Sequence, residues 1–179
     1  MKSVFYLLCI GLLVPSLVNG GATFSDCGDA NKKLVMKDGS VKPDPIHYPG
    51  NLTMNVSMVV LKDLPAANFQ MKMSLMKLEP RRMKVPCLQD IGSCTYDVCD
   101  MIKNHKDTFC PMFPDPKDCG CPMKANSYFM KNAFVPIPDF GEIFAKILQG
   151  GYEGNITFID GSTNTEVGCV AMTFQIVPK

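Results

Sequence analysis

The residues best suited to chemistry in this chain of 179 residues are nine cysteines and two histidines. Cys9 falls in an apolar leader, and the remaining eight are Cys27, Cys87, Cys94, Cys99, Cys110, Cys119, Cys121 and Cys169. An even number of cysteines behind a leader predicts four disulfides, although the count leaves their pairing open. Cys119-x-Cys121, with Cys110 and His105, would also suit zinc. Because the secretory route is oxidising, we expect disulfides and no metal.

No catalytic motif accompanies these residues. His47 lies in a proline-rich turn, and His105 lies between lysines. The chain has neither a G-x-S-x-G elbow nor a His-Glu-x-x-His motif. Asp97 and Asp100 could act as acid and base, but at the start of a helix they more simply complement its dipole. We therefore expect a protein that is not an enzyme and has no cofactor.

The leader predicts where the protein goes. Met1-Lys2 is followed by an apolar run over residues 4–18, too short to span a bilayer comfortably. The pattern indicates a signal peptide over residues 1–20, with an uncleaved anchor as the alternative. Residues 21–179 then form a single domain, expected in the secretory pathway, the lysosome or outside the cell. A net charge of +1 and the lack of a basic patch argue against nucleic acid as a partner.

Alternation of period two dominates the remaining sequence and predicts an all-β fold. Expected strands cover residues 52–60, a run from Phe69, and residues 82–86, 128–135, 152–159 and 168–177. Their apolar faces carry Met54, Val56, Met58, Val60, Phe69, Met71, Met73, Leu75, Ile156, Phe158, Met172 and Phe174. Methionine is flexible and suits surfaces that adapt to varied partners. It also fills ordinary cores, so the pattern leaves a ligand cavity and a packed core open.

Two short helices are expected. Thr95 can cap a helix that runs to about Asn104. Asp139 can cap another, with Glu142 as the partner of a capping box. The second helix carries an apolar stripe of Phe140, Ile143, Phe144, Ile147 and Leu148, and Gly150-Gly151 should end it.

Three sequons predict N-glycosylation at Asn51, Asn55 and Asn155. Each asparagine falls on the polar side of its expected strand, so the glycans would lie in water and the apolar faces would point the other way.

Several motifs then resemble a known family. They are Phe24-Ser25-x-Cys27, Pro43-Asp44-Pro45-Ile46, Pro49-Gly50-Asn51-Leu52-Thr53, Lys84-Val85-Pro86-Cys87, Ile91-Gly92-Ser93-Cys94-Thr95, Cys119-x-Cys121-Pro122 and Gly168-Cys169. Together they resemble the ganglioside-activator family of the ML-domain lipid-recognition superfamily, over the whole chain after the leader.

The resemblance implies an antiparallel β-cup or sandwich with an apolar lipid cavity. Such proteins lift glycosphingolipids from membranes and present them to a lysosomal β-hexosaminidase. The implied disulfides are Cys27–Cys169, Cys87–Cys94, Cys99–Cys121 and Cys110–Cys119. The twelve apolar strand residues above would line the cavity.

A membrane-facing rim would combine Arg81, Arg82 and Met83 with the stripe of the second helix. The family's rim loops use tryptophan, and this chain has none. Packing of the stripe on the sheet is the alternative to a rim. Two other functions also stay open: a carrier of a sterol, fatty acid or other hydrophobic ligand without an enzyme partner, and a hydrolase or phospholipase inhibitor.

Overall fold

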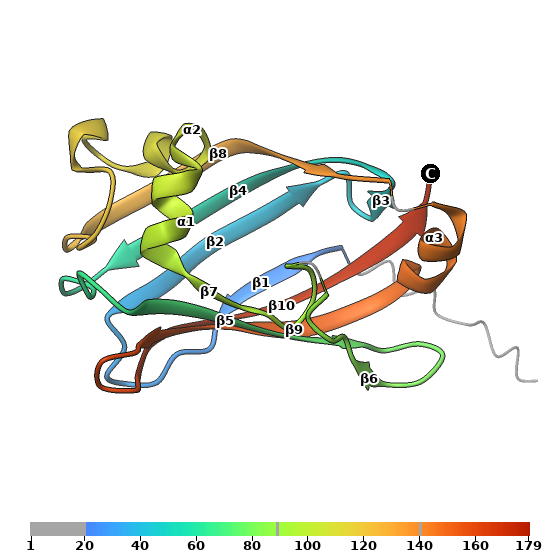
Figure 1. Cartoon of the computed structure of the whole chain (residues 1–179), viewed down its shortest axis with the longest axis horizontal. Coiled ribbons are helices and arrows are strands. Elements are labelled where there is room, and N and C mark those ends of the chain that lie inside the picture. Colours follow the sequence, from blue (N-terminus) through green and yellow to red (C-terminus); the bar gives the residue numbers. More distant parts are fainter. Residues whose placement is uncertain (1–20, 89, 140) are drawn as a thin grey trace, which may run out of the picture.

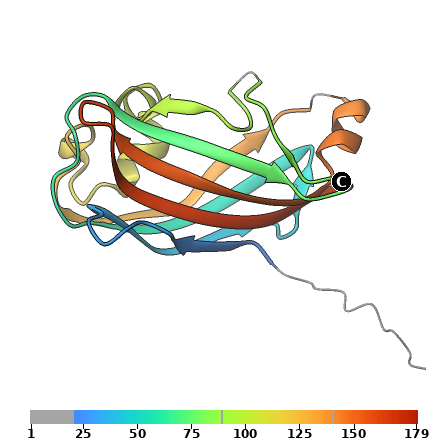
Figure 2. The same cartoon turned by 90° about the horizontal axis from the view of Figure 1, so that it is seen from below.

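The computed structural model describes residues 21–88, 90–139 and 141–179. The expected signal peptide, residues 1–20, lies outside the described residues. Two β-sheets form two layers that face each other, with short helices at both ends (Figures 1 and 2). Among the described residues, no helix has the length and apolarity needed to cross a bilayer. The all-β class and the antiparallel two-layer arrangement predicted from the sequence are confirmed.

The larger sheet has the strand order β1-β10-β9-β5-β6, with β3 added beside β10 and β7 beside β5. Its strands are β1 (Thr23–Asp26), β3 (Ile46–Tyr48), β5 (Phe69–Lys77), β6 (Met83–Lys84), β7 (Thr95–Asp97), β9 (Gly150–Asp160) and β10 (Thr165–Pro178). The pairing is antiparallel except between β3 and β10. The smaller sheet has the order β2-β4-β8, from β2 (Leu34–Lys42), β4 (Gly50–Val60) and β8 (Asn126–Ile137).

The strand predictions hold where alternation is regular. The runs expected at 52–60, 128–135, 152–159 and 168–177 lie inside β4, β8, β9 and β10, and the run from Phe69 is β5. The expected strand over 82–86 shrinks to Met83–Lys84, because it pairs with β5 at two positions only. Strand β2 escaped prediction, since a bulge between Met36 and Asp38 and the glycine at 39 interrupt its alternation.

Both predicted helix caps are wrong. Thr95 begins β7, and helix α1 (Val98–Asn104) is capped by Asp97, whose carboxylate accepts from the Asp100 N–H at 2.9 Å. Helix α3 (Glu142–Leu148) begins after Gly141, and Asp139 instead closes a turn by accepting from the Gly141 N–H at 2.7 Å. Gly141 has a φ of 91°, which favours glycine and leaves Glu142 inside the helix rather than completing a capping box.

Three further helical turns follow α1 without having been predicted: α2 (Lys106–Phe109) and the 3-10 helices η1 (Cys110–Met112) and η2 (Pro116–Asp118). They belong to a cysteine-rich segment that disulfides shape more than periodicity does. The four disulfides are Cys27–Cys169, Cys87–Cys94, Cys99–Cys121 and Cys110–Cys119, the same pairs that the family resemblance implies.

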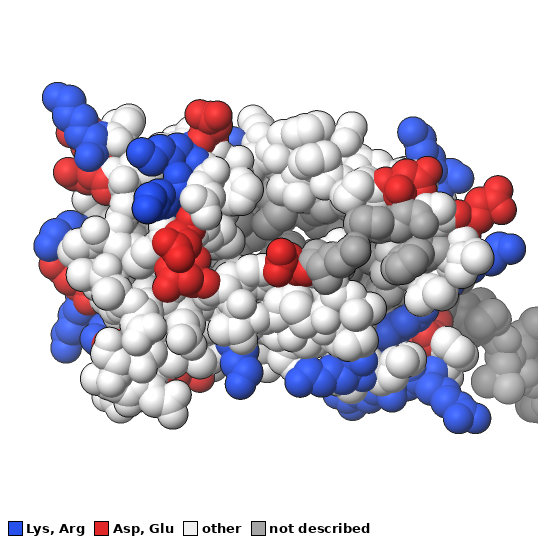
Figure 3. All heavy atoms as spheres, in the orientation of Figure 1, with Lys and Arg blue, Asp and Glu red and all other residues white. Residues whose placement is uncertain are grey.

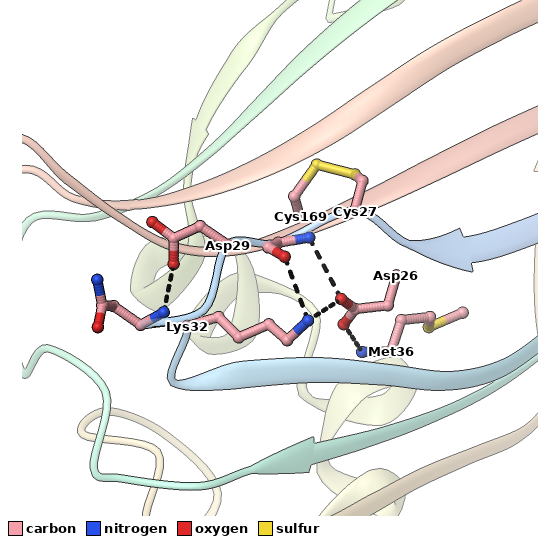
Figure 4. A network of polar contacts seen from close by, with 8 residues as sticks. Asp26, Cys27, Asp29, Lys32, Met36 and Cys169 are labelled. Atoms are coloured by element: carbon pink, nitrogen blue, oxygen red, sulfur yellow. Dashed lines mark hydrogen bonds and ion pairs between the residues drawn. A yellow bond between two sulfur atoms is a disulfide. The ribbon is translucent and has the colours of Figure 1, made fainter.

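The two layers meet along one edge, where β1 of the larger sheet lies beside β2 of the smaller sheet (Figure 4). Asp26 at the end of β1 accepts from the Met36 N–H of β2 at 3.0 Å, from the Gly28 N–H at 3.2 Å and from the Lys32 ammonium. Next to it, the Cys27–Cys169 disulfide ties β1 to β10. One carboxylate thus holds both sheets at their shared edge.

The surroundings of Asp26 act on its pKa in opposite directions. Its burial alone would raise the pKa, but the hydrogen bond and charge of Lys32, with the N–H groups of Met36 and Gly28, outweigh that effect. The pKa therefore lies below the ordinary value near 4. A lowered pKa means that the charged carboxylate stabilises the fold above about pH 4, and that this contribution is lost as the pH falls through the lowered value.

Replacing Asp26 by asparagine should lower the free energy of unfolding by about 2 kcal/mol at pH 7, because charge-assisted hydrogen bonds between the layers are weakened. Urea unfolding should show this deficit unchanged at pH 5 and shrinking below about pH 4. Asp29→Asn is the matched control, since Asp29 accepts from the Asn31 N–H in the same loop and does not join the layers. Equal deficits for the two variants, or a deficit at Asp26 that stays constant to pH 3, would contradict this account.

Candidate functional site

The inner faces of the two sheets carry the hydrophobic clusters found among the described residues. All twelve residues predicted from alternation lie in or against these clusters. Five of them are buried: Val60, Phe69, Leu75, Phe158 and Met172. The other seven are partly buried and pack against the clusters: Met54, Val56, Met58, Met71, Met73, Ile156 and Phe174. The alternation therefore identified the inward face correctly and did not say how tightly it is packed.

This interior is free of charge. Among the described residues, no polar or charged residue is buried and no buried side-chain polar atom lacks a hydrogen-bond partner. The Tyr152 hydroxyl donates to the Leu148 carbonyl at 2.6 Å, and the Tyr128 hydroxyl donates to the Lys124 carbonyl at 2.8 Å. Burial raises the pKa of both tyrosines, so they stay neutral. A surface of this kind favours aliphatic or aromatic ligands over polar ones.

Packing differs between the two ends of the interior. At the end that carries α1, one large cluster joins both sheets and includes Phe69, Val98, Ile102, Phe113 and Tyr128. Phe113 meets Tyr128 edge-on, with ring centroids 5.2 Å apart. The Cys99–Cys121 and Cys110–Cys119 disulfides hold the α1–η2 segment over this end.

The opposite end is divided. One cluster is centred on Val41, Ile46 and Leu52, and a separate cluster on Leu75, Tyr152 and Met172. Partly buried residues common to both clusters are Phe24, Phe174 and Ile176. A β-sandwich usually buries its facing sheets in one contiguous core. The interior at this end is therefore split into two clusters, although the first of them joins both sheets, since Val41 and Leu52 belong to the smaller sheet and Ile46 to the larger.

The opening lies on the side where the sheets do not meet. The space-filling view is hollowed near its centre, between the layers (Figure 3). Figure 1 places the loop closed by the Cys87–Cys94 disulfide near the centre of the view, α3 at the end away from α1, and the turn before β6 at that same end below the larger sheet. We call these three segments the mouth.

Apolar side chains of the mouth are strongly exposed. The exposed fractions are 75% for Ile143 and 57% for Ile147 on α3. Leu88 and Ile91 of the Cys87–Cys94 loop and Met83, which begins β6 directly after the turn, are also exposed. The α3 stripe thus points Ile143 and Ile147 to solvent instead of packing both on the sheet. Leu148 is half-buried, Phe140 lies outside the described residues, and the side chain of Phe144 is likewise not described.

Helix α3 is held at its C-terminal end. The Lys77 ammonium of β5 donates to the Ile147 carbonyl, and Tyr152 donates to the carbonyl of Leu148. Tyr152 in turn stacks on Phe174, with ring centroids 5.2 Å apart. These contacts fix α3 to the larger sheet while Ile143 and Ile147 remain exposed.

Basic side chains lie beside these apolar ones. Figure 3 shows Lys and Arg gathered along the side where Figure 1 places β6 and the turn before it. Arg81 and Arg82 are both exposed. Arg82 pairs with Glu153 on β9, whereas Arg81 takes part in no salt bridge among the described residues. Arg81 therefore contributes an exposed cation outside these ion pairs, in a turn that also carries Glu79.

The sequence reading missed Leu88 and Ile91. They flank the tip of the Cys87–Cys94 loop, and their backbones pair with each other as an isolated bridge. The available signal was two large apolar residues inside a short disulfide loop, where a turn usually carries polar residues.

The alternative zinc site is wrong. Cys110, Cys119 and Cys121 are all in disulfides. Within the described part of the chain, no group of three His, Cys, Asp or Glu residues is placed to hold a metal. His47 lies on β3, and His105 joins α1 to α2.

Comparison with known proteins agrees with this geometry. A family model described as the ML domain matches residues 21–176. A relative from Mus musculus named Ganglioside GM2 activator is 27% identical over 172 residues, which cover 92% of this chain and 87% of the relative. A second relative of that name, from Macaca fascicularis, is 32% identical over 106 residues, 54% of each chain. A Niemann-Pick type C2 protein from Japanese carpenter ant aligns with a TM-score of 0.49 and 13% identity, over 86% of this chain and 98% of its own.

The difference in exposure between the mouth and the core predicts a difference in the free energy of unfolding when each is mutated. The double variant Ile143→Ser/Ile147→Ser should change the free energy of unfolding by less than about 1 kcal/mol, because exposed positions contribute little. Leu75→Ala should cost about 2–5 kcal/mol, since Leu75 is 9% exposed within its cluster. Thermal or urea unfolding measures both. A similar loss for the two proteins would show that the α3 stripe is part of the core.

Proposed function

This chain belongs to the ML-domain family, and from that premise we propose that it is a non-enzymatic lipid-binding protein that carries glycosphingolipids. The resemblance to ganglioside activators drawn from its motifs is confirmed by the two relatives of that name. In this proposal the lipid tails enter between the sheets, and the headgroup stays at the mouth for a lysosomal β-hexosaminidase. The protein works in the secretory pathway, in the lysosome or outside the cell.

The observation that carries the proposal is the uncharged inner faces of the two sheets, where seven of the twelve inward residues are only partly buried. Each methylene of a lipid tail gains about 0.8 kcal/mol when it leaves water. A bilayer offers the same gain, so transfer from bilayer to cup is nearly neutral in free energy. Partly buried methionines such as Met54 and Met73 can adjust to tails of different shape at little cost.

The mouth supports the second half of the proposal, which is contact with a membrane. Ile143 and Ile147 present apolar groups that can enter the interface of a bilayer, while Arg81 adds attraction to anionic lipid. Tails that pass from bilayer to cup across such a surface avoid most of their exposure to water. Without these groups at the mouth, the equilibrium of lipid between the bilayer and the protein would be unchanged, but lipid transfer would be slower.

The inner face can be tested with two methionines of one strand. Met73 of β5 packs against the inner cluster, whereas Met76 lines the outer face of the same sheet. Met73→Ser should weaken retention of a fluorescent ganglioside roughly tenfold, because about two apolar groups leave the contact with the tails. Met76→Ser should retain lipid as the parent protein does. Native mass spectrometry and fluorescence titration give the two readouts.

Equal lipid retention by the parent protein, Met73→Ser and Met76→Ser would contradict an inner binding site. Failure of the purified parent protein to bind any ganglioside would contradict the proposed ligand class.

Transfer kinetics test the mouth separately from the cavity. Ile143→Ser/Ile147→Ser should extract ganglioside from liposomes about fivefold or more slowly, because the apolar contact with the bilayer is reduced. Its affinity for ganglioside presented in detergent should stay unchanged, since the inner face is intact. Stopped-flow fluorescence gives the extraction rate. An unchanged rate would remove α3 from the membrane contact.

A further inference from the structure

The outer face of the larger sheet, which Figure 2 views, carries a trough that the lipid function does not use. Strand register places four residues in one row across β1, β10, β9 and β5: Ser25 beside Ala171, Ala171 beside Asn155, and Asn155 beside Ser74. Three of the four side chains are Ser or Ala, so this row projects only a short distance from the sheet. It forms part of a hollow of about 410 Å³ that Thr23, Met76, Arg82, Glu153 and Thr173 also line.

Asn155 stands in the middle of this row and begins the sequon Asn155-Ile156-Thr157. Its side chain is exposed, while Ile156 packs into the interior. The asparagine amide is therefore presented to solvent at the centre of a depression.

We propose that Asn155 carries an N-linked glycan whose first sugars lie in this trough. The proposal rests on the secretory route described above. The Asn155 amide nitrogen forms a bond to C1 of N-acetylglucosamine from a lipid pyrophosphate-linked oligosaccharide. The bond between C1 and the phosphate oxygen breaks, the lipid pyrophosphate leaves, and the nitrogen loses one proton to a base.

The lining of the trough suits a sugar. Ser25 and Ser74 offer hydroxyls on the two sides of Asn155, and the Thr23 and Thr173 hydroxyls hydrogen-bond to each other at 2.6 Å along the adjacent row. Hydroxyls both donate and accept, as sugar hydroxyls do. The Arg82–Glu153 ion pair closes the side of the trough toward β6 with further polar groups.

Asn55 offers a contrast within the same molecule. Its side-chain oxygen accepts from the Asn132 N–H at 2.9 Å, and its side-chain nitrogen donates to the Ser40 hydroxyl at 3.3 Å. Asn132 has a φ of 51° at the bulge of β8, so Asn55 holds an irregular backbone in place. The fold thus uses the side chain of Asn55, whereas it leaves the Asn155 amide facing an open trough.

The presence of the glycan is tested with two substitutions of Thr157, the third residue of the sequon. The full chain is secreted from a eukaryotic host, and the sites are read by mass spectrometry of intact protein and glycopeptides. Thr157→Val keeps a β-branched residue on the strand and should remove one glycan. Thr157→Ser retains the sequon and should keep it. If Asn155 is unmodified in the parent protein, the proposal is overturned, whether or not Asn51 and Asn55 carry glycans. This result would leave the proposed lipid function unaffected.

The position of the sugars is tested by filling the trough. Ser74→Tyr places a ring directly beside Asn155, and Ser25→Tyr, made separately, places one beyond Ala171 in the same row; both leave the sequon intact. Release of the Asn155 glycan by a peptide amidase from the folded protein should become about tenfold faster in either folded variant, because the sugars are displaced into solvent. Both comparisons use variants shown by circular dichroism to fold. Release at the parent rate from both variants overturns the placement of the glycan in the trough.

Discussion

The architecture depends on a single constraint: two sheets must be joined along one edge and kept unsealed along the other. Asp26 satisfies the first part, because one carboxylate accepts from β2 and from the loop that leaves β1. The Cys27–Cys169 disulfide beside it closes a separation of 142 residues. In the chain-entropy model a loop of this length contributes roughly 5 kcal/mol. With this edge fixed, the opposite edge is free to stay apart without separation of the layers.

An open edge between the two sheets reduces the stability of the fold. Partly buried apolar side chains lose part of the stabilisation that full burial gives. The end carrying α1 compensates with a dense cluster that joins both sheets and with two disulfides in the segment above it. The other end keeps two separate clusters, linked by Phe24, Phe174 and Ile176. The larger, denser cluster thus lies at the end that carries α1, and the other end has smaller clusters with more partly buried side chains around them.

Much of this could be predicted from the sequence, because alternation of period two reports directly which side of a strand is buried. The inward residues of β4, β5, β9 and β10 follow from it. Features set by single hydrogen bonds could not be predicted in this way. Asp97 rather than Thr95 caps α1, since strand β7 begins at Thr95 and runs to Asp97. The Asp26 network joins residues that nothing in local periodicity connects, and Leu88 and Ile91 lie in a loop where no period exists.

The same alternation also assigns different roles to the outer and inner faces. The sequon asparagines of β4 and β9 lie on the sides of their strands opposite to the apolar clusters, and a glycan attached at either strand would cover an outer face. Approach to a membrane by such a face would bury sugar against lipid, which is unfavourable for groups that bind water. The mouth has no sequon, and it combines exposed Ile143 and Ile147 with the charge of Arg81. Under the proposed function, strand register therefore constrains both the face that holds the lipid tails and the direction from which a membrane would deliver them.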